Sequence, residues 1–489
     1  MLEDVVCITD KYLNSKSKND RKKIGQFFTS KETAEFMANL SKIHNENIRI
    51  LDAGAGTGIL SIALLEKLNN IEKIKNIEID LYENDENIVE LLKNNIEKVR
   101  TEIPKIKKCN ILNENFILYN KNNFVKKYDI IISNPPYKKI GKSADEAVIM
   151  EDVVYGQPNM YFLFMAMAER LLKDNGEMIF IIPRSWTSGA YFKKFRQSFL
   201  NKVKLTNIHL FVSRDKVFSQ ENVLQETMII RAIKTQERQD SVTISQSFSN
   251  ADFNNINTYN IEYDTCVQKN NDRYVYLPTN DEEIKVLQTI NSFKTKLNDI
   301  GVKLKTGLTV DFRNERLIEN NSSNNNVPLL SSVHFNNGVI KFPSKDNEQQ
   351  YIRKDIKSLL QRNTNYLFIK RFSSKEENRR IQPAMFFKHE FKEYDYISTE
   401  NHINFIASID EDELQEEIIY GLYGLYNSTL YDKYYRILNG STQVNATEIN
   451  NIPIPDENLI KHIGECLMKK EDLSTEICDN ILLEVIRNE

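Results

Sequence analysis

Between residues 48 and 231, short apolar runs alternate with segments whose apolar residues recur at helical spacing. Runs of this length, bounded by polar residues, are typical of buried strands; they are Ile48–Leu51, Ile77–Tyr82, Ile106–Leu112, Tyr128–Ser133 and Met178–Ile182. Helical spacing follows the first two, over Ile59–Leu68 and Ile88–Ile96. The alternation predicts an α/β fold, a mostly parallel sheet with helices on both faces.

Local signals predict where two of the helices begin. Asn84 follows a strand, and its short polar side chain suits the N-cap of the next helix. Pro158 is expected as the first helical residue before Met160–Leu172, because that position needs no backbone N–H. Ligands of such folds bind beyond the carboxyl ends of the strands, so the loops there are the places to look for a site.

The strand–helix alternation ends near Arg238. Ser241–Asn257 is rich in Ser, Asn and Thr and weakly periodic, which is typical of a linker or an irregular start of a second domain. Short aromatic-rich segments and turns follow, and helical patterns return over Glu411–Leu438 and about Glu457–Arg487. We therefore expect two domains, residues 1–240 and residues 241–489, the second of mixed α/β structure.

Composition adds limits on function. The chain has 489 residues, 40% hydrophobic and 27% charged, with 65 Lys and Arg against 69 Asp and Glu, a net charge of −4. This balance is not that of a strongly basic nucleic-acid-binding domain. Any contact with DNA would depend on local basic clusters, at residues 11–25 and 353–380. Taken alone, such charge runs are usually solvated faces.

The sequence also argues against several environments and ligands. Its apolar runs are shorter than a membrane span requires, and the first residues do not resemble a secretory signal. The five cysteines form no CxxC pair and the six histidines show no ligand spacing, so neither a disulfide framework nor a metal site is expected. We expect a cytoplasmic bacterial protein that needs no metal.

The first candidate site is the glycine-rich turn after the first strand. It contains Asp52, Ala53, Gly54 and Gly56, and glycines there let a ligand approach the backbone where a helix begins. A dinucleotide fingerprint starting at Gly54 would need a glycine at Ile59. A ligand without a diphosphate, such as S-adenosylmethionine, therefore fits better. An ordinary glycine-containing turn is the alternative.

An acidic residue stands at the end of the second strand. Glu83 is placed to accept hydrogen bonds from both hydroxyls of a ribose, with Asn84 beside it. The two strand ends together predict a nucleoside-binding site.

The second candidate site is Asn134-Pro135-Pro136-Tyr137, at the end of a buried strand. Two prolines hold the backbone rigid and remove two N–H donors, so carbonyl oxygens and the Asn134 amide can accept from one amino group. Holding both protons of an exocyclic amine in a tetrahedral arrangement frees its lone pair for attack on a methyl sulfonium. Tyr137 offers a flat face for stacking the ring that carries the amine.

With these two motifs in this order, the chain resembles the DNA adenine-N6 methyltransferases of type II restriction–modification systems in the gamma arrangement. In that arrangement the cofactor motifs come first, the catalytic motif follows and the target-recognition domain is last. The resemblance is close over residues 22–232 and loose beyond. It implies a Rossmann-like, seven-stranded mixed sheet, with Ile208–Val212 and Met228–Arg231 as an antiparallel edge hairpin, and a C-terminal mixed α/β target-recognition domain.

The resemblance also implies roles for particular residues. Gly25–Thr29, with Phe27 and Thr29, resembles the motif that closes over the methionine end of the cofactor, although Thr29 and Glu32 also fit a plain helix capping box. Phe218 resembles the aromatic residue that stacks on the flipped adenine opposite Tyr137; a role as plain core is the alternative. Asn110 stands where family members commonly carry an Asp that accepts from the cofactor's adenine amine.

The second half is expected to read the DNA sequence. Segments around Arg371, Gln443 and Asn445 resemble parts of recognition domains, and these side-chain types suit guanine and adenine edges. Lys138 is a further candidate for DNA contact. The expected mechanism rotates the target adenine out of the duplex, stacks it between Tyr137 and Phe218, and yields S-adenosylhomocysteine without a metal.

Other functions stay open at this stage. Methyltransferases of RNA base amines or of protein glutamine N5 can use the same motif, but usually end soon after the sheet, whereas more than 240 residues follow here. A non-catalytic DNA-binding specificity subunit is a different class, disfavoured by the intact Asp52, Glu83 and Asn134. A separate cognate restriction endonuclease is a plausible partner.

Overall fold

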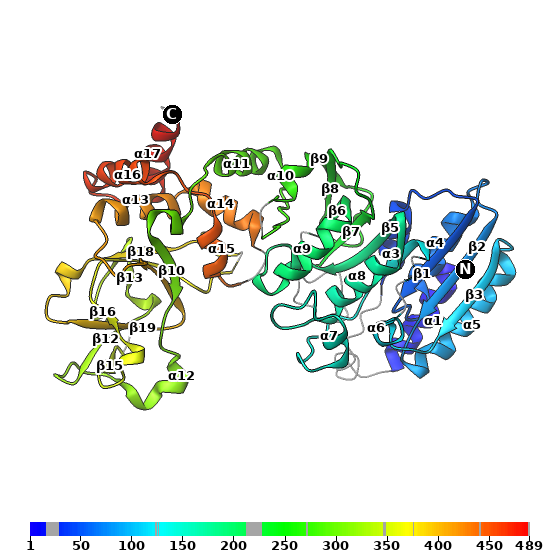
Figure 1. The fold of residues 1–489 in the computed structure, drawn as a ribbon, viewed down its shortest axis with the longest axis horizontal. Helices are drawn as coiled ribbons and strands as arrows, with labels where there is room; N and C mark the ends of the chain where they lie inside the picture. The colour runs from blue at the N-terminus through cyan, green and yellow to red at the C-terminus, as the bar shows by residue number, and fades with distance from the viewer. Residues whose placement is uncertain are drawn as a thin grey trace. The chain divides into compact units, whose positions relative to one another are not determined.

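The computed structural model describes residues 1–15, 29–122, 125, 127–211, 227–269, 272–345, 349–374, 376–439 and 442–487. They form two compact units, Met1–Asn280 and Asp281–Glu489 (Figure 1). Phe27 and Phe218 lie outside the described residues.

The first unit is built on a nine-stranded sheet in the order β3-β2-β1-β4-β5-β7-β6-β8-β9. Strands β1 to β5 run parallel to one another, and β7 runs antiparallel to β5 and β6. The expected mostly parallel sheet and antiparallel hairpin are therefore confirmed, but the expected number of seven strands is wrong, because β8 and β9 extend the sheet beyond β6. The strands are β1 Asn47–Ala53, β2 Asn76–Tyr82, β3 Ile106–Leu112, β4 Tyr128–Ser133, β5 Leu172–Pro183, β6 Lys204–Phe211, β7 Thr227–Ile233, β8 Ser241–Ser247 and β9 Asn257–Glu262.

Helices cover both faces because the strand order reverses at β1. The chain runs outward from β1 to β3 and then returns to β4 on the other side of β1. With right-handed crossovers, helices before and after that return lie on opposite faces. They are α1 Leu2–Ser15, α3 Lys31–Leu40, α4 Ile59–Asn69, α5 Glu86–Glu102, α6 Phe116–Tyr119, α7 Asp145–Ile149, α8 Met160–Leu171, α9 Lys193–Lys202 and α10 Tyr263–Cys266.

The core sits between the sheet and these helices. Every residue of β4 is buried, as two-sided coverage requires. Helix α8 is apolar around almost its whole circumference and only Arg170 escapes full burial, which is typical of a helix enclosed by protein. Phe162 of α8 packs edge-on against Phe192 and at a tilt against Phe195. The central strands are thereby held rigidly where their ends carry the candidate site.

The prediction that Ser241–Asn257 is a linker or an irregular start of the second domain is wrong. Strand β8 occupies its first part and pairs in parallel with β6, and β9 pairs with β8. Val242 and Ile244 are fully buried, but two apolar residues in alternation are too few to reveal a strand in the sequence. The hairpin of β6 and β7 is consequently not at the sheet edge, and the first unit extends to Asn280.

Three expected helix starts are also wrong by one or two residues. Asp85, not Asn84, caps α5 by accepting from the Asn87 N–H. Asn159 caps α8, so Pro158 lies before the cap and not inside the helix. Ser30 caps α3 by accepting from Thr33, which removes the capping box proposed for Thr29. In each case several neighbouring polar residues could have served, and the path of the preceding chain decided between them.

The second unit contains two sheets and a set of C-terminal helices, a mixed α/β structure as expected. The six-stranded sheet has the order β10-β20-β17-β18-β14-β13 and the five-stranded one β11-β15-β12-β19-β16. The strands are β10 Val302–Thr306, β11 Ile318–Glu319, β12 Asn326–Leu330, β13 Phe335–Asn336, β14 Val339–Ile340, β15 Tyr351–Arg353, β16 Gln361–Arg362, β17 Tyr366–Lys370, β18 Pro383–Phe386, β19 Tyr396–Thr399 and β20 Ile403–Ser408.

Close helix packing holds the C-terminal end of this unit together. A Cβ atom at Gly464 would lie 1.9 Å from the Glu417 carbonyl oxygen, and one at Gly421 would lie 2.0 Å from that of Ile460. Only glycine permits α13 (Glu416–Tyr426) and α16 (Glu457–Met468) to approach so closely. The helices are α11 Asp281–Ser292, α12 Asp311–Asn314, α13 Glu416–Tyr426, α14 Thr429–Leu438, α15 Ala446–Asn451, α16 Glu457–Met468 and α17 Thr475–Arg487. No helix among the described residues is long and apolar enough to span a bilayer.

Candidate functional site

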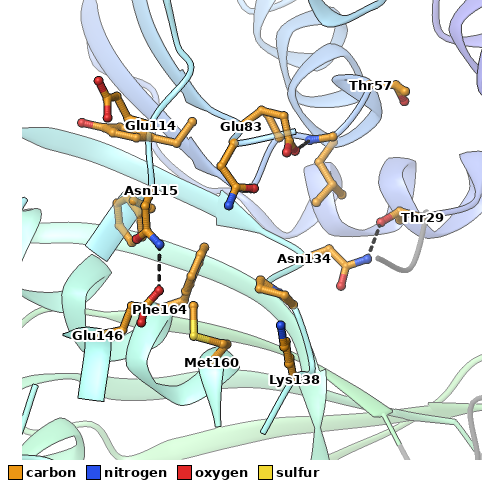
Figure 2. Close-up of a pocket in the computed structure, with 18 of the residues that line it drawn as sticks. Thr29, Thr57, Glu83, Glu114, Asn115, Asn134, Lys138, Glu146, Met160 and Phe164 are labelled. Carbon is orange, nitrogen blue, oxygen red and sulfur yellow. Dashed lines mark hydrogen bonds between the residues drawn. The ribbon is translucent and has the colours of Figure 1, made fainter. Parts of the chain in front are cut away.

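A cavity of about 430 Å³ opens at the carboxyl ends of four neighbouring strands, β3, β2, β1 and β4. This is the edge at which α/β sheets bind ligands, and the volume is typical of a small-molecule site. Figure 2 shows Glu83, Asn115 and Asn134, from the loops after three of these strands, around it. The lining residues are Thr29, Gly54, Ala55, Gly56, Thr57, Ile59, Leu60, Tyr82, Glu83, Asn84, Glu114, Asn115, Phe116, Asn134, Pro136, Lys138, Ile140, Glu146, Met160 and Phe164.

The glycine-rich turn forms one wall of this cavity. Gly54 and Gly56 have φ values of +80° and +55°, which favour glycine. The Gly54 and Ala55 N–H groups donate to the Tyr82 carbonyl oxygen at 2.9 and 2.8 Å. The turn is therefore tied to the end of β2 and presents its backbone to the cavity.

Glu83 fixes the same turn from the other side. One carboxylate oxygen accepts from the Gly56 N–H and the other from the Asp85 N–H, both at 2.9 Å. Burial raises the pKa of Glu83, and these two N–H groups oppose that shift. Asn84 lines the cavity beside it. The acid has remaining lone pairs for a ligand hydroxyl.

Asp52 and Ala53 support the turn from behind and do not line the cavity. Asp52 is fully buried and accepts from the Ser61 hydroxyl at 2.6 Å. Burial raises its pKa to about 7, a shift that the Ser61 hydrogen bond opposes. The Ala53 carbonyl oxygen accepts from the Ser133 hydroxyl at 2.5 Å, which joins the ends of β1 and β4.

Two helices hold Thr57, a lining residue that sequence reasoning missed. The Thr57 hydroxyl is 2.7 Å from that of Thr9 in α1. The Asn95 side chain in α5 donates to the Thr57 carbonyl oxygen at 2.9 Å. Both partners are distant in sequence and ordinary in type, so no local signal could have pointed to them.

Asn134 lies at the end of β4 and meets the N-terminal segment. Its Nδ2 donates to the Thr29 hydroxyl at 3.1 Å across 105 residues of sequence (Figure 2). Thr29 is buried and both residues line the cavity. Pro136 also lines it, whereas Pro135 is buried. The structure thus brings together Thr29, the glycine-rich turn, Glu83 and Asn134, as expected from the sequence.

Tyr137 is packed rather than open to the cavity. It is 9% exposed, its hydroxyl donates to the Ile181 carbonyl oxygen at 3.0 Å, and its ring meets Tyr161 edge-on at 6.3 Å. It is not among the lining residues, whereas the exposed Lys138 is. The ring is therefore not part of the cavity lining, although both chain neighbours, Pro136 and Lys138, are.

The expected role of Asn110 does not fit its position. It lies within β3 and donates to the Asp80 carboxylate at 2.6 Å, and it does not line the cavity. Glu114, Asn115 and Phe116 line it instead, because they follow the end of β3. The sequence suggested Asn110 because its amide oxygen can accept a hydrogen bond, but the residue lies inside the strand and not after its end. The signal that could have corrected it is the N-cap pattern of Asn115 before α6.

In the second unit, Arg371 and Gln443 lie in adjoining segments. Phe372 and Gln443 form an isolated β-bridge, and the Val444 N–H donates to the Arg371 carbonyl oxygen at 2.7 Å. The Arg371 guanidinium donates to the Asn401 carbonyl oxygen at 2.8 Å. Asn445 is the N-cap of α15. These three candidates are thus gathered at one place.

The basic cluster at residues 353–380 is not one solvated face. Arg380 is fully buried, and Arg379 donates to the carbonyl oxygens of Tyr426 and Ser428 at 3.1 and 3.0 Å. Arg353 pairs with Asp355, and Lys370 pairs with Glu377. Arg379 and Arg380 are therefore structural cations, which corrects the expectation of a solvated face for this segment. A DNA contact by Arg371 stays a prediction.

The strand order, the glycine-rich turn after β1 and the acid after β2 define an S-adenosylmethionine-dependent methyltransferase fold. Residues 13–218 match the family described as Eco57I restriction-modification methylase. The type II methyltransferase M.BsuBI of Bacillus subtilis is 32% identical over 485 residues, 96% of this chain and 95% of the relative. M.PstI of Providencia stuartii is 32% identical over 460 residues, 91% and 89% of the two chains.

The chain therefore belongs to the type II methyltransferases. Among solved structures, the type IIL restriction-modification enzyme MmeI, in complex with DNA, matches with a TM-score of 0.56 at 14% identity. That match covers 100% of this chain and 72% of MmeI, and it shows that the fold is shared.

Proposed function

We propose that this protein transfers a methyl group from S-adenosylmethionine to the N6 amine of an adenine in duplex DNA, as the modification enzyme of a restriction–modification system. One observation carries the proposal. Asn134 of the Asn-Pro-Pro-Tyr motif lines the same cavity as the glycine-rich turn and Glu83, so an acceptor for an amine and a nucleoside site share one space.

The cavity residues suit the cofactor. Glu83 would accept from the ribose hydroxyls, and the open backbone of Gly54 and Gly56 would allow the amino acid end to lie close. Phe116 and Phe164 pack on each other, with ring centroids 5.1 Å apart, and together offer an apolar wall for the base. When bound, S-adenosylmethionine supplies an electrophilic methyl group on sulfur.

The role of Asn134 follows from how its amide is held. Because Nδ2 donates to Thr29, the amide has a defined orientation, and its oxygen is the atom available to accept from a substrate amine. The rigid prolines keep neighbouring carbonyl oxygens at the same place. Together they would position the amine for in-line attack without a strong base.

The target adenine would enter this site by rotating out of the duplex. Lys138 and Pro136 line the cavity, and Tyr137 lies between them in the chain. Stacking on Tyr137 would need a shift of the loop that follows the motif, since its ring is now packed. Phe218 is proposed for the opposite face on its resemblance alone.

The second unit is proposed as the target-recognition domain. The family relation and the DNA complex of MmeI support this role, and Arg371, Gln443 and Asn445 are the proposed contacts. A separate cognate endonuclease is proposed as the biological partner.

The test is modification-sensitive sequencing of DNA from cells expressing the chain, with Asn134→Ala as the control. N6-methyladenine at one sequence context in the wild type, and its loss in Asn134→Ala, is expected. Purified enzyme that labels RNA or a polypeptide but leaves duplex adenine unlabelled refutes the proposal. Methylated cytosine in place of adenine would refute the base assignment alone.

A further inference from the structure

Glu146 is a cavity-lining carboxylate that none of the roles above uses. It lies in the first turn of α7, in the segment that follows the Asn-Pro-Pro-Tyr motif. Its Oε1 accepts from the Asn115 Nδ2 at 2.8 Å. Figure 2 shows the Glu146 carboxylate pointing at the Asn115 amide. The hydrogen bond connects α7 to the loop after β3, and both residues line the cavity.

Asn115 has little capacity left to accept hydrogen bonds from a ligand. Its side-chain oxygen already accepts from the Ile117 and Leu118 N–H groups at 3.0 and 3.1 Å, which caps α6. Its Nδ2 is a donor and points to Glu146. An amide oxygen has two lone pairs, so both are used.

Glu146 retains that capacity. A carboxylate accepts about four hydrogen bonds, and Asn115 uses one. Its acceptor strength is high because the group is charged. The cavity's other carboxylate with assigned partners, Glu83, accepts from two backbone N–H groups.

The position of Glu146 matches the base end of the cofactor. In Figure 2, Thr29 and Asn134 lie at one side of the view, Asn115, Glu146 and Phe164 at the other, and Glu83 between them. If the methyl group lay at Asn134 and the ribose at Glu83, the purine would lie toward Phe116, Phe164 and Glu146. This placement rests on the proposed function.

We infer that Glu146 is the residue that recognises the 6-amino group of the cofactor's adenine, held in place by Asn115. An exocyclic amine donates to the carboxylate, whereas a 6-oxo purine presents an acceptor that the carboxylate repels. Glu146 therefore selects adenosyl over inosyl cofactors, a task that neither Asn110 nor Asn115 can perform here.

The test is calorimetric binding of S-adenosylhomocysteine and S-inosylhomocysteine to the full chain. The wild type is expected to prefer the adenosyl compound by about tenfold or more, the scale of one hydrogen bond to a charged group. Glu146→Gln, of equal size, should bring the preference close to one. Asp145→Asn, an exposed neighbour with the same charge change, should leave it unchanged.

A double substitution that exchanges the amide and the carboxylate tests whether a carboxylate is needed at this end of the cavity. In Asn115→Asp with Glu146→Gln, the new Gln donates to the new Asp, so a carboxylate is again present at this end. The preference should recover at least in part. Each variant is first checked by thermal unfolding.

Two results overturn the inference. One is an unchanged preference in Glu146→Gln, and the other is a loss of preference in Glu114→Gln instead, which would assign the role to the neighbouring lining carboxylate. A wild type that binds neither compound would refute the proposed function itself, and the inference with it.

Discussion

Replacing Thr29 by Val tests whether Asn134 depends on the orientation that the structure gives it. The substitution keeps the shape of the side chain and removes the oxygen that accepts from the Asn134 Nδ2 at 3.1 Å. Thr29 is 7% exposed, so water cannot readily replace that oxygen. The amide donor would then face a methyl group.

The size of the effect follows from the cost of that contact. Removing the acceptor of this hydrogen bond costs about 1–3 kcal/mol, and the amide loses the contact with Thr29 that holds it in this orientation. Since about 1.4 kcal/mol corresponds to a tenfold change in population, the catalytic orientation should become about tenfold rarer. Turnover should fall by the same factor, while a Thr29→Ser variant, which keeps the hydroxyl, should retain most activity.

The assay is single-turnover transfer of radiolabelled methyl to duplex DNA at saturating cofactor. Cofactor affinity is measured separately by calorimetry, because Thr29 also lines the cavity, and thermal unfolding checks the fold. A Thr29→Val enzyme that turns over at the wild-type rate would refute the reasoning. So would a Thr29→Ser enzyme as slow as Thr29→Val, because the hydroxyl would then be irrelevant.

Two further predictions concern stability. Arg379→Ala should lower the free energy of unfolding by about 2–3 kcal/mol, because two part-buried hydrogen bonds to carbonyl oxygens are lost. Lys357→Ala, at an exposed position, should change it by less than about 0.5 kcal/mol. Urea unfolding measures both, and equal effects would contradict the structural role of Arg379. Asp52, whose pKa is raised by burial to about 7, should make the protein less stable as pH rises from about 4 to 7, because the unfolded state releases its proton first. Asp52→Asn should flatten this part of the stability profile in urea unfolding at pH 5 and pH 8; an unchanged slope would show that Asp52 does not carry it.

Much of the first unit could be predicted because its signals are local. A buried strand such as Tyr128–Ser133 and a helix such as Ile59–Asn69 are encoded by the spacing of their own apolar residues. Once the strand–helix alternation is recognised, the ends of parallel strands must meet at one edge. Gly54, Glu83 and Asn134 could therefore be assigned to one site from the sequence.

Contacts between distant segments were decided by the tertiary structure. Thr29 meets Asn134, Thr9 meets Thr57, and Glu146 meets Asn115, and none of these pairs has a spacing that marks it. Three helices begin one or two residues away from the predicted position, because several neighbouring polar residues could cap each of them.

Burial likewise depends on the rest of the chain. Arg379 resembles a surface cation in sequence, yet its partners come from the end of α13 and the start of α14. Val242 and Ile244 form a strand only because β6 offers an edge to pair with. The amino-acid sequence by itself determined the order of elements and the chemistry at their ends, because neighbouring residues encode both. Which side chains face the cavity, and which charges are enclosed, depended on the packing of segments far apart in the chain.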